Sequence, residues 1–220
     1  MNFFKKNLTD ITIFILLQYI FMAVVLMYLY NGGNVVDAHS KEYVWNINLL
    51  NDLGRTVFYN GQKNIFWLYY SLSLFLIGIG IMLFFYLISR LLETTKLRNL
   101  IMILGVISGL GYIIMAFSPI NINPVLNLAA SKVGLFAFIS AIFVLNLFLD
   151  KDKYRFLYYN ILIFNILLII ALFYQSFMLE FNKPDFIIKY MAVMQKIIVF
   201  FQLVFASFVL YYIKKRKLYF

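Results

Sequence analysis

The sequence predicts an all-α integral membrane protein, a bundle of six transmembrane helices with a polar, non-cytoplasmic interfacial segment that caps one end. Three observations lead to this fold class. The chain of 220 residues is 64% hydrophobic and only 13% charged, whereas a soluble domain ordinarily carries about 25% charged residues. Its mean hydropathy is +0.88. The apolar residues also fall in long blocks, and the basic residues gather beside those blocks.

Six apolar segments are long enough to cross a bilayer, because a transmembrane helix needs about 20 mostly apolar residues to span roughly 30 Å of hydrocarbon. The first segment is too long for the apolar region of a signal peptide and no small-residue cleavage pattern follows it, so we expect a retained span. Together the segments predict a single integral membrane domain, 1–220, with spans at approximately 11–30, 65–88, 100–117, 125–149, 158–178 and 186–213.

Local signals set several of the predicted helix ends. The residue before a proline leaves the helical region, so Pro119 predicts the end of the third span. Asn123 followed by Pro124 is typical of a helix N-cap with proline at the first helical position. Asn182 and Pro184 predict the start of the sixth span in a similar way.

The basic residues indicate the orientation, because loops rich in Lys and Arg stay in the cytoplasm. Most of them lie in the N-terminal stretch, in the loops after the second and fourth spans, and in the tail: Lys5, Lys6, Arg90, Lys96, Arg98, Lys151, Lys153, Arg155, Lys214, Lys215, Arg216 and Lys217. We therefore expect both termini in the cytoplasm, and the plasma (inner) membrane as the location if the protein is bacterial. The same arrangement accounts for the net charge of +10, so no nucleic-acid partner is expected.

Small residues mark faces where helices can approach closely. Gly105 and Gly109 form a GxxxG pattern in the third span, and Ala130 and Gly134 give the fourth span a related face. In lipid, such faces support helix association through close backbone contact. The favoured interpretation is packing of neighbouring helices within the chain. A homo- or hetero-oligomer contact through these faces is the alternative.

Polar residues are concentrated in the stretch NLLNDLGRTVFYNGQKN, residues 48–64, which lies between the first two spans. Asp52 and Arg55 are three residues apart, so one helical turn would bring them to a common face. Large apolar residues such as Leu53 and Phe58 give the stretch an apolar side as well. This combination predicts an interfacial, partly re-entrant segment that caps the bundle on the non-cytoplasmic side.

Lys132 and Lys196 lie inside predicted spans, where a lysine at the helix centre costs ~2.5–3.5 kcal/mol. One alternative is that each extends its amine to the headgroup region. The other is a polar chamber near the outer leaflet, in which both lysines face inward and meet Asp52, Glu180, Asp185 or an anionic ligand. The chamber hypothesis predicts a ligand-binding set of Asp52, Arg55, Asn127, Lys132, Gln195 and Lys196.

No catalytic residue, metal site or cofactor is predicted. The chain has no cysteine and one histidine, which excludes disulfides, thiolate metal sites and histidine clusters. Ser131 and Lys132 do not form a dyad, because adjacent helical residues point about 100° apart. No Gly-rich phosphate loop, HExxH or GxSxG pattern is present.

The order of these features resembles a six-span membrane family of unknown function that is grouped with DRAM-like and Frag-type (GPI lipid-remodelling) proteins. The residues that carry the resemblance are Asp52, Leu53, Gly54, Asn60, Pro119 and Lys196. The chain departs from the family pattern at Asn121, Asn123 and Asn127, where an acid and a histidine are expected, and at Gln195, where a glutamate is expected. The resemblance implies a lipid-related role.

The favoured functional hypothesis is a non-catalytic membrane protein that binds a lipid or another amphiphile in the polar chamber, with membrane lipids as its partners. Three alternatives stay open. The first is a small-solute transporter. The second is an intramembrane enzyme on lipid-linked substrates, in which Arg55 and the two lysines hold a phosphate and Asp52 is the base. The third is a structural assembly subunit.

Overall fold

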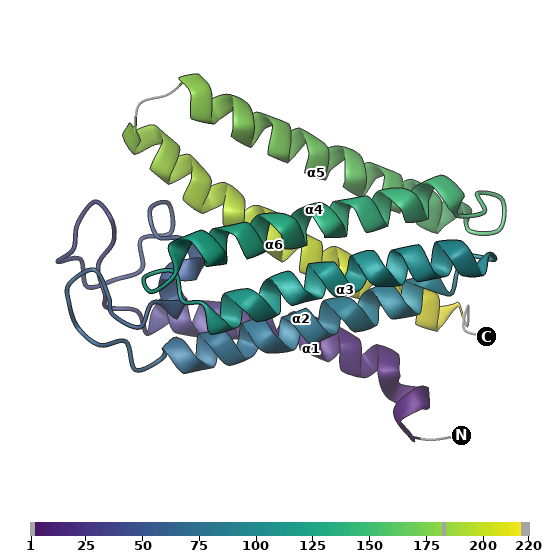
Figure 1. The fold of residues 1–220 in the computed structure, drawn as a ribbon, viewed down its shortest axis with the longest axis horizontal. Coiled ribbons are helices and arrows are strands. Elements are labelled where there is room, and N and C mark those ends of the chain that lie inside the picture. Colours follow the sequence, from purple (N-terminus) through teal and green to yellow (C-terminus); the bar gives the residue numbers. More distant parts are fainter. Residues whose placement is uncertain (1–2, 182–183, 217–220) are drawn as a thin grey trace.

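A computed structural model describes the backbone of residues 3–181 and 184–216, and the side chains of residues 7–171 and 190–216. Within these ranges the chain forms six α-helices and one short 3-10 helix (Figure 1). The elements are α1 (Phe3–Tyr28), η1 (Leu50–Gly54), α2 (Trp67–Ser89), α3 (Thr95–Phe117), α4 (Pro124–Phe148), α5 (Arg155–Phe181) and α6 (Pro184–Lys215).

Five helices are long and apolar enough to cross a membrane within the described residues: α2, α3, α4, the part of α1 from Asn7 and the part of α6 from Tyr190. The part of α5 whose side chains are described, Arg155–Ala171, is apolar but shorter. The chain is therefore a multi-pass helical membrane protein, and the predicted all-α class is confirmed. Six crossings and a capping segment at the membrane surface stay predictions.

The helix ends near the third and fourth spans confirm the local sequence signals. α3 ends at Phe117, two residues before Pro119. α4 begins at Pro124, and the side-chain oxygen of Asn123 accepts a hydrogen bond from the backbone N–H of Leu126 at 3.1 Å. α6 begins at Pro184 as predicted; Asn182 lies outside the described residues.

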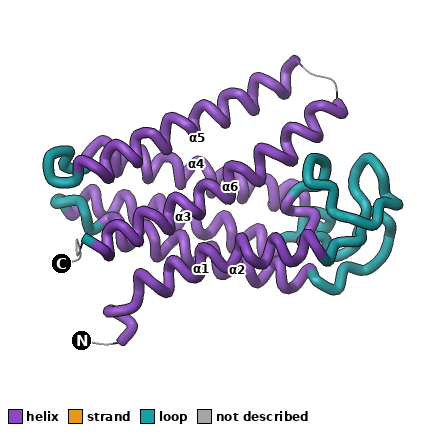
Figure 2. The backbone as a smooth tube through the Cα atoms, turned by 180° about the vertical axis from the view of Figure 1, so that it is seen from behind, coloured by secondary structure: helices purple, strands orange, loops and turns teal. Residues whose placement is uncertain are grey.

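Successive helices run back and forth along the long axis of the bundle (Figure 1). The long connection of residues 29–66 lies at one end, which we term the loop end (Figure 2). The short turns 90–94 and 149–154 lie at the other end together with the N-terminal and C-terminal ends of the chain, and we term it the hairpin end. The loops that carry most of the basic residues thus share one end of the molecule.

Glycines bring α2, α3 and α4 into close contact. A side chain at Gly109 would lie 2.4 Å from the carbonyl oxygen of Gly78 on α2, and one at Gly105 would overlap Phe85 of the same helix. A side chain at Gly111 would lie 2.8 Å from the Cα of Gly134 on α4. The GxxxG face therefore packs within the chain, against α2. Oligomerisation of the protein stays a prediction.

A row of phenyl rings connects α2, α4, α5 and α6. Phe84 of α2 stacks on Phe138 of α4 with ring centroids 6.2 Å apart, and Phe138 contacts Phe164 of α5 at 6.4 Å. Phe164 in turn stacks on Phe205 of α6 at 3.8 Å. Three of these rings, those of Phe84, Phe138 and Phe164, are almost completely buried. This aromatic row holds four helices together across the centre of the bundle.

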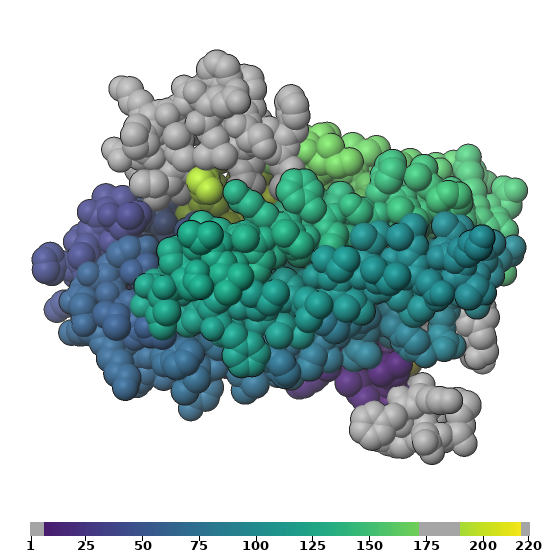
Figure 3. Space-filling model, in the orientation of Figure 1, coloured from purple at the N-terminus to yellow at the C-terminus, as the bar shows by residue number. Residues whose placement is uncertain are grey.

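The outer surface of the helices is apolar. Figure 3 shows that α3 and α4 form much of one face of the molecule. Large side chains on these two helices are exposed, among them Ile103, Val106, Leu110, Val133, Phe136 and Phe143. Such a surface suits contact with lipid chains, because they offer the same apolar environment as a protein interior.

Candidate functional site at the loop end

The 3-10 helix η1 closes the loop end of the bundle. Leu50 and Leu53 are fully buried, and the element packs against α1, α2 and α6. Asp52 stabilises its first turn, because one carboxylate oxygen accepts a hydrogen bond from the backbone N–H of Leu49 at 2.8 Å. The chain leaves η1 in an extended conformation at Arg55.

Asn48, directly before η1, connects this element to the preceding loop. Its side-chain oxygen accepts a hydrogen bond from the backbone N–H of Val44 at 2.9 Å, and its amide nitrogen donates to the carbonyl of Gly33 at 3.0 Å. Its own carbonyl accepts from the hydroxyl of Tyr43 at 3.1 Å. Asn48 is completely buried, so these bonds are shielded from solvent and fix the loop above the helices.

Lys196 of α6 reaches into the same cluster. Its side chain has 0% exposure, and its ammonium donates hydrogen bonds to the carbonyls of Asn48 and Ala192. The rings of Tyr43 and Trp45 lie with their centroids 5.2 Å and 5.1 Å from the amine. Cation–π contacts at such distances are favourable. The amine of Lys196 therefore turns into the protein, where it bonds to two backbone carbonyls.

Asp52 is 3% exposed and accepts bonds on both carboxylate oxygens. Besides the Leu49 N–H, it receives the hydroxyl of Tyr59 at 3.0 Å and the side-chain amide of Asn48 at 3.4 Å. Burial raises the pKa of Asp52 above its usual value, and these hydrogen bonds oppose that rise. Asn48 therefore links the buried carboxylate to the buried ammonium, since it bonds to both Asp52 and Lys196.

Arg55 lies at the rim of the cluster and is half-buried. Its guanidinium stacks over the ring of Tyr59, 4.0 Å from the centroid. Burial, followed by the neighbouring charge of Asp52, raises the pKa of Tyr59 to about 12. The expected pairing of Asp52 and Arg55 thus runs through Tyr59, which donates to the carboxylate and supports the guanidinium.

Two further predicted residues hold η1 to the helices. The side-chain oxygen of Gln195 on α6 accepts the backbone N–H of Leu50 at 2.8 Å. The side-chain oxygen of Asn127 on α4 accepts the amide of Asn51 at 2.9 Å, while its nitrogen donates to the carbonyl of Ser118 at 2.8 Å. The polar residues of α4 and α6 therefore bind the connecting segment itself.

Lys132 is not part of this cluster. Its side chain is exposed, and among the described residues it makes no hydrogen bond or ion pair. It lies five residues after Asn127, which places it about 140° further around α4. The structure thus separates the two lysines that the sequence treats alike. The side chains of Glu180 and Asp185 lie outside the described residues.

Sequence reasoning missed Asn48, Asn51, Tyr43 and Trp45 as members of the cluster. The sequence contained a signal, because asparagines that stand among large apolar residues need hydrogen-bond partners once they are buried. Chemically, the arrangement fixes the loop to α6 and leaves Asp52 engaged in three hydrogen bonds. Within the described ranges, no three His, Cys, Asp or Glu residues lie close enough to hold a metal ion.

Comparison with known proteins gave no relative of this chain. No protein-family model matches the sequence, and no curated protein or solved structure matches it significantly. The functional conclusions therefore depend on the chain's own residues and geometry.

Proposed function

We propose that the protein crosses the membrane six times, with both termini in the cytoplasm, and that it binds a lipid or another amphiphile without catalysing a reaction. α5 supports the sixth crossing, because its 27 residues extend about 40 Å at the usual helical rise. The positions of the basic loops at the hairpin end support the orientation. The loop end then faces the non-cytoplasmic leaflet.

The observation that carries the proposal is the exposed ammonium of Lys132 on an apolar helix face. Large apolar side chains surround it along α4: Leu128, Val133 and Phe136 are about half exposed or more. Lys132 lies about 12 Å from the start of α4, so its flexible stem brings the amine within reach of the headgroups. An anionic lipid of the outer leaflet fits this surface, because its acyl chains can contact the apolar side chains while its headgroup meets the amine.

The buried cluster has a different part in this proposal. Asp52, Asn127, Gln195 and Lys196 are engaged with the chain itself, so they hold η1 in place and set the shape of the outer end. Arg55, at the rim, keeps most of its donors available for a headgroup. The amphiphile therefore binds on the outer surface of the bundle beside the cluster.

Native mass spectrometry in phospholipid nanodiscs tests the proposal. We expect Lys132→Leu to lower retention of anionic lipid about fivefold, the effect of about 1 kcal/mol for one basic residue at the lipid surface. Lys63→Leu, which removes an exposed lysine of the loop end outside the helices, is the matched control and should retain lipid normally. Equal retention of anionic lipid by wild type and Lys132→Leu would contradict a lipid site at Lys132.

An enzymatic role is the second candidate, and one observation argues against it. The sequence-based hypothesis makes Asp52 a base, yet its carboxylate accepts three hydrogen bonds. Proton abstraction would require these bonds to break first. Turnover of a lipid extract by wild type and loss of that turnover in Asp52→Asn would establish the enzymatic role in place of simple binding.

A further inference from the structure

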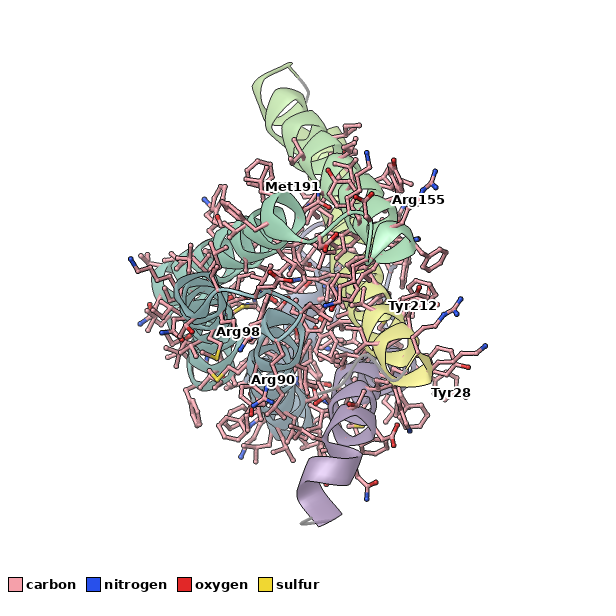
Figure 4. All side chains as sticks on the ribbon, turned by 90° about the vertical axis from the view of Figure 1, so that its right-hand side faces the viewer. Tyr28, Arg90, Arg98, Arg155, Met191 and Tyr212 are labelled. Carbon is pink, nitrogen blue, oxygen red and sulfur yellow. The ribbon has the colours of Figure 1, made fainter. Side chains whose placement is uncertain are left out.

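A pocket of about 400 Å³ lies at the hairpin end, between the end of α2 and the start of α3. Ligand pockets in proteins commonly fall between about 300 and 1,000 Å³. Its lining residues are Tyr86, Ser89, Arg90, Arg98, Asn99 and Met102. α3 begins at Thr95, before its apolar stretch, so that Arg98 and Asn99 stand on its first turns opposite the last turn of α2. Figure 4 shows the two arginines near each other at this end.

Each arginine donates one hydrogen bond within the hairpin of α2 and α3, and this bond holds it in position. The Nε of Arg98 donates to the carbonyl of Leu92 at 2.6 Å. A terminal nitrogen of Arg90 donates to the hydroxyl of Tyr86 at 2.6 Å, and its guanidinium lies 4.8 Å from the centroid of that ring. A guanidinium carries five N–H donors. Most donors of both groups therefore remain available to a ligand.

The two guanidiniums have no acidic partner within the described residues, where Lys214 and Asp10 form the ion pair, with 2.6 Å between nitrogen and oxygen. Three residues of the segment 86–102 are basic, and Glu93 is its one acid. Two positive charges that share a pocket repel each other, and an anion between them relieves that repulsion.

We propose that this pocket binds a phosphate group, supplied by an anionic phospholipid of the cytoplasmic leaflet. Arginine is suited to phosphate because its planar fork donates two parallel hydrogen bonds to the oxygens. Basic pockets between transmembrane helices on the cytoplasmic side are typical sites for lipid headgroups. The side-chain amide of Asn99 supplies a further donor to the same group.

The surroundings of the pocket fit a lipid as the source of the phosphate. Met102 and the ring of Tyr86 give the pocket an apolar side. Directly above it on α3, Ile103 and Val106 are about half exposed, so acyl chains attached to the phosphate can continue along this helix. This inference rests on the proposed function only for the orientation, which places the hairpin end on the cytoplasmic side. The pocket therefore faces the leaflet opposite to that of Lys132.

The experiment compares wild type with Arg90→Gln/Arg98→Gln in nanodiscs that contain phosphatidylglycerol and phosphatidylcholine. We expect wild type to retain phosphatidylglycerol selectively in native mass spectrometry. The double variant should lose this selectivity about 30-fold, because it removes two surface charges together with the charge-assisted hydrogen bonds that both guanidiniums donate to the phosphate. Lys151→Gln/Lys153→Gln removes two bases from the other hairpin of the same end, so it tests general surface attraction, and its loss should be clearly smaller than that of the double variant.

A second arm adds inorganic phosphate to the protein in phosphatidylcholine nanodiscs. Binding by wild type and not by the double variant, without selectivity for phosphatidylglycerol, would support the phosphate site with a soluble anion as its ligand. Equal lipid retention in wild type and the double variant, with no binding of phosphate, would overturn the proposal. This outcome leaves the Lys132 test unaffected, so the two proposals fail separately.

A third variant covers the case in which the double variant does not fold. Arg98→Lys keeps the charge and removes the planar fork, so selectivity for phosphatidylglycerol should fall about tenfold, the effect of one lost charge-assisted hydrogen bond. Unchanged selectivity in Arg98→Lys would contradict recognition of the phosphate by this guanidinium.

Discussion

At the loop end, the ammonium of Lys196 is fully buried and donates to two backbone carbonyls. At the hairpin end, the guanidiniums of Arg90 and Arg98 line a pocket and form no ion pair with an acid within the described residues. The first cation is surrounded by acceptors and aromatic rings that the chain itself supplies. The other two are fixed by one bond each and keep most of their donors free.

The role of each cation follows from the partners that the fold supplies to it. A buried charge is tolerated only if it is paired or hydrogen-bonded, so Lys196 stabilises the fold and its loss should be felt in stability. A cation that the fold leaves unmatched can bind an external anion, so its loss should be felt in binding. Stability measurements at the two ends therefore test whether the buried and the unpaired cations differ in this way.

The largest effect is expected for Lys196→Ala. The substitution removes two hydrogen bonds from a charged group, two cation–π contacts and a large buried side chain, so we expect a loss of about 3 kcal/mol in the free energy of unfolding. Unfolding of the purified protein in detergent measures it. Lys132→Ala is the control and should change stability by less than about 0.5 kcal/mol, as usual for an exposed position. Similar losses in both variants would abolish the distinction between the two lysines.

A smaller effect is expected for the bond between Asn51 and Asn127, which joins η1 to α4. Replacement of either residue by alanine leaves the other without its partner. A double-mutant cycle of Asn51→Ala and Asn127→Ala should give a coupling energy of about 1 kcal/mol, because polar contacts in membrane proteins are modest. A coupling near zero would show that η1 is not held to α4 by this pair.

Asp52 should make stability at the loop end depend on pH. Burial raises its pKa in the folded protein above the usual 3.8, so the proton stabilises the fold below that usual value, and this contribution is lost as the pH rises through the folded pKa. The melting temperature of wild type should therefore fall, relative to that of Asp52→Asn, as the pH rises above the usual value of 3.8. Asp37→Asn, at an exposed carboxylate of the same loop, should leave the dependence as in wild type.

The smallest effect is expected at the hairpin end, for the ion pair between Lys214 and Asp10. Both side chains are about half exposed, and exposed pairs contribute about 0.2–1 kcal/mol. Lys214→Ala should therefore lower the free energy of unfolding by about 0.5 kcal/mol, within that range, and salt should reduce the difference further. A loss as large as that of Lys196→Ala would show that the hairpin end also depends on its cations for stability.

Much of the helical framework could be predicted from the sequence. The start of α4 at Pro124, with Asn123 as its cap, follows from local chemistry that involves only neighbouring residues. The separation of Lys132 from Lys196 could not be predicted, because it depends on how far each helix is rotated within the bundle. In the sequence, Arg90 and Arg98 indicate only topology, because their shared pocket arises when α2 and α3 pack together.

The class of the protein follows from its sequence: apolar blocks of about 20 residues form helices, because a helix satisfies all backbone hydrogen bonds of such a segment within lipid. Which cations find partners within the protein depends on the tertiary structure. Only the packed chain brings the carbonyl of Asn48 to the amine of Lys196 and leaves Arg90 and Arg98 without an ion pair in the described structure. Charge matching is a property of distances between residues far apart in sequence, and no local pattern contains those distances.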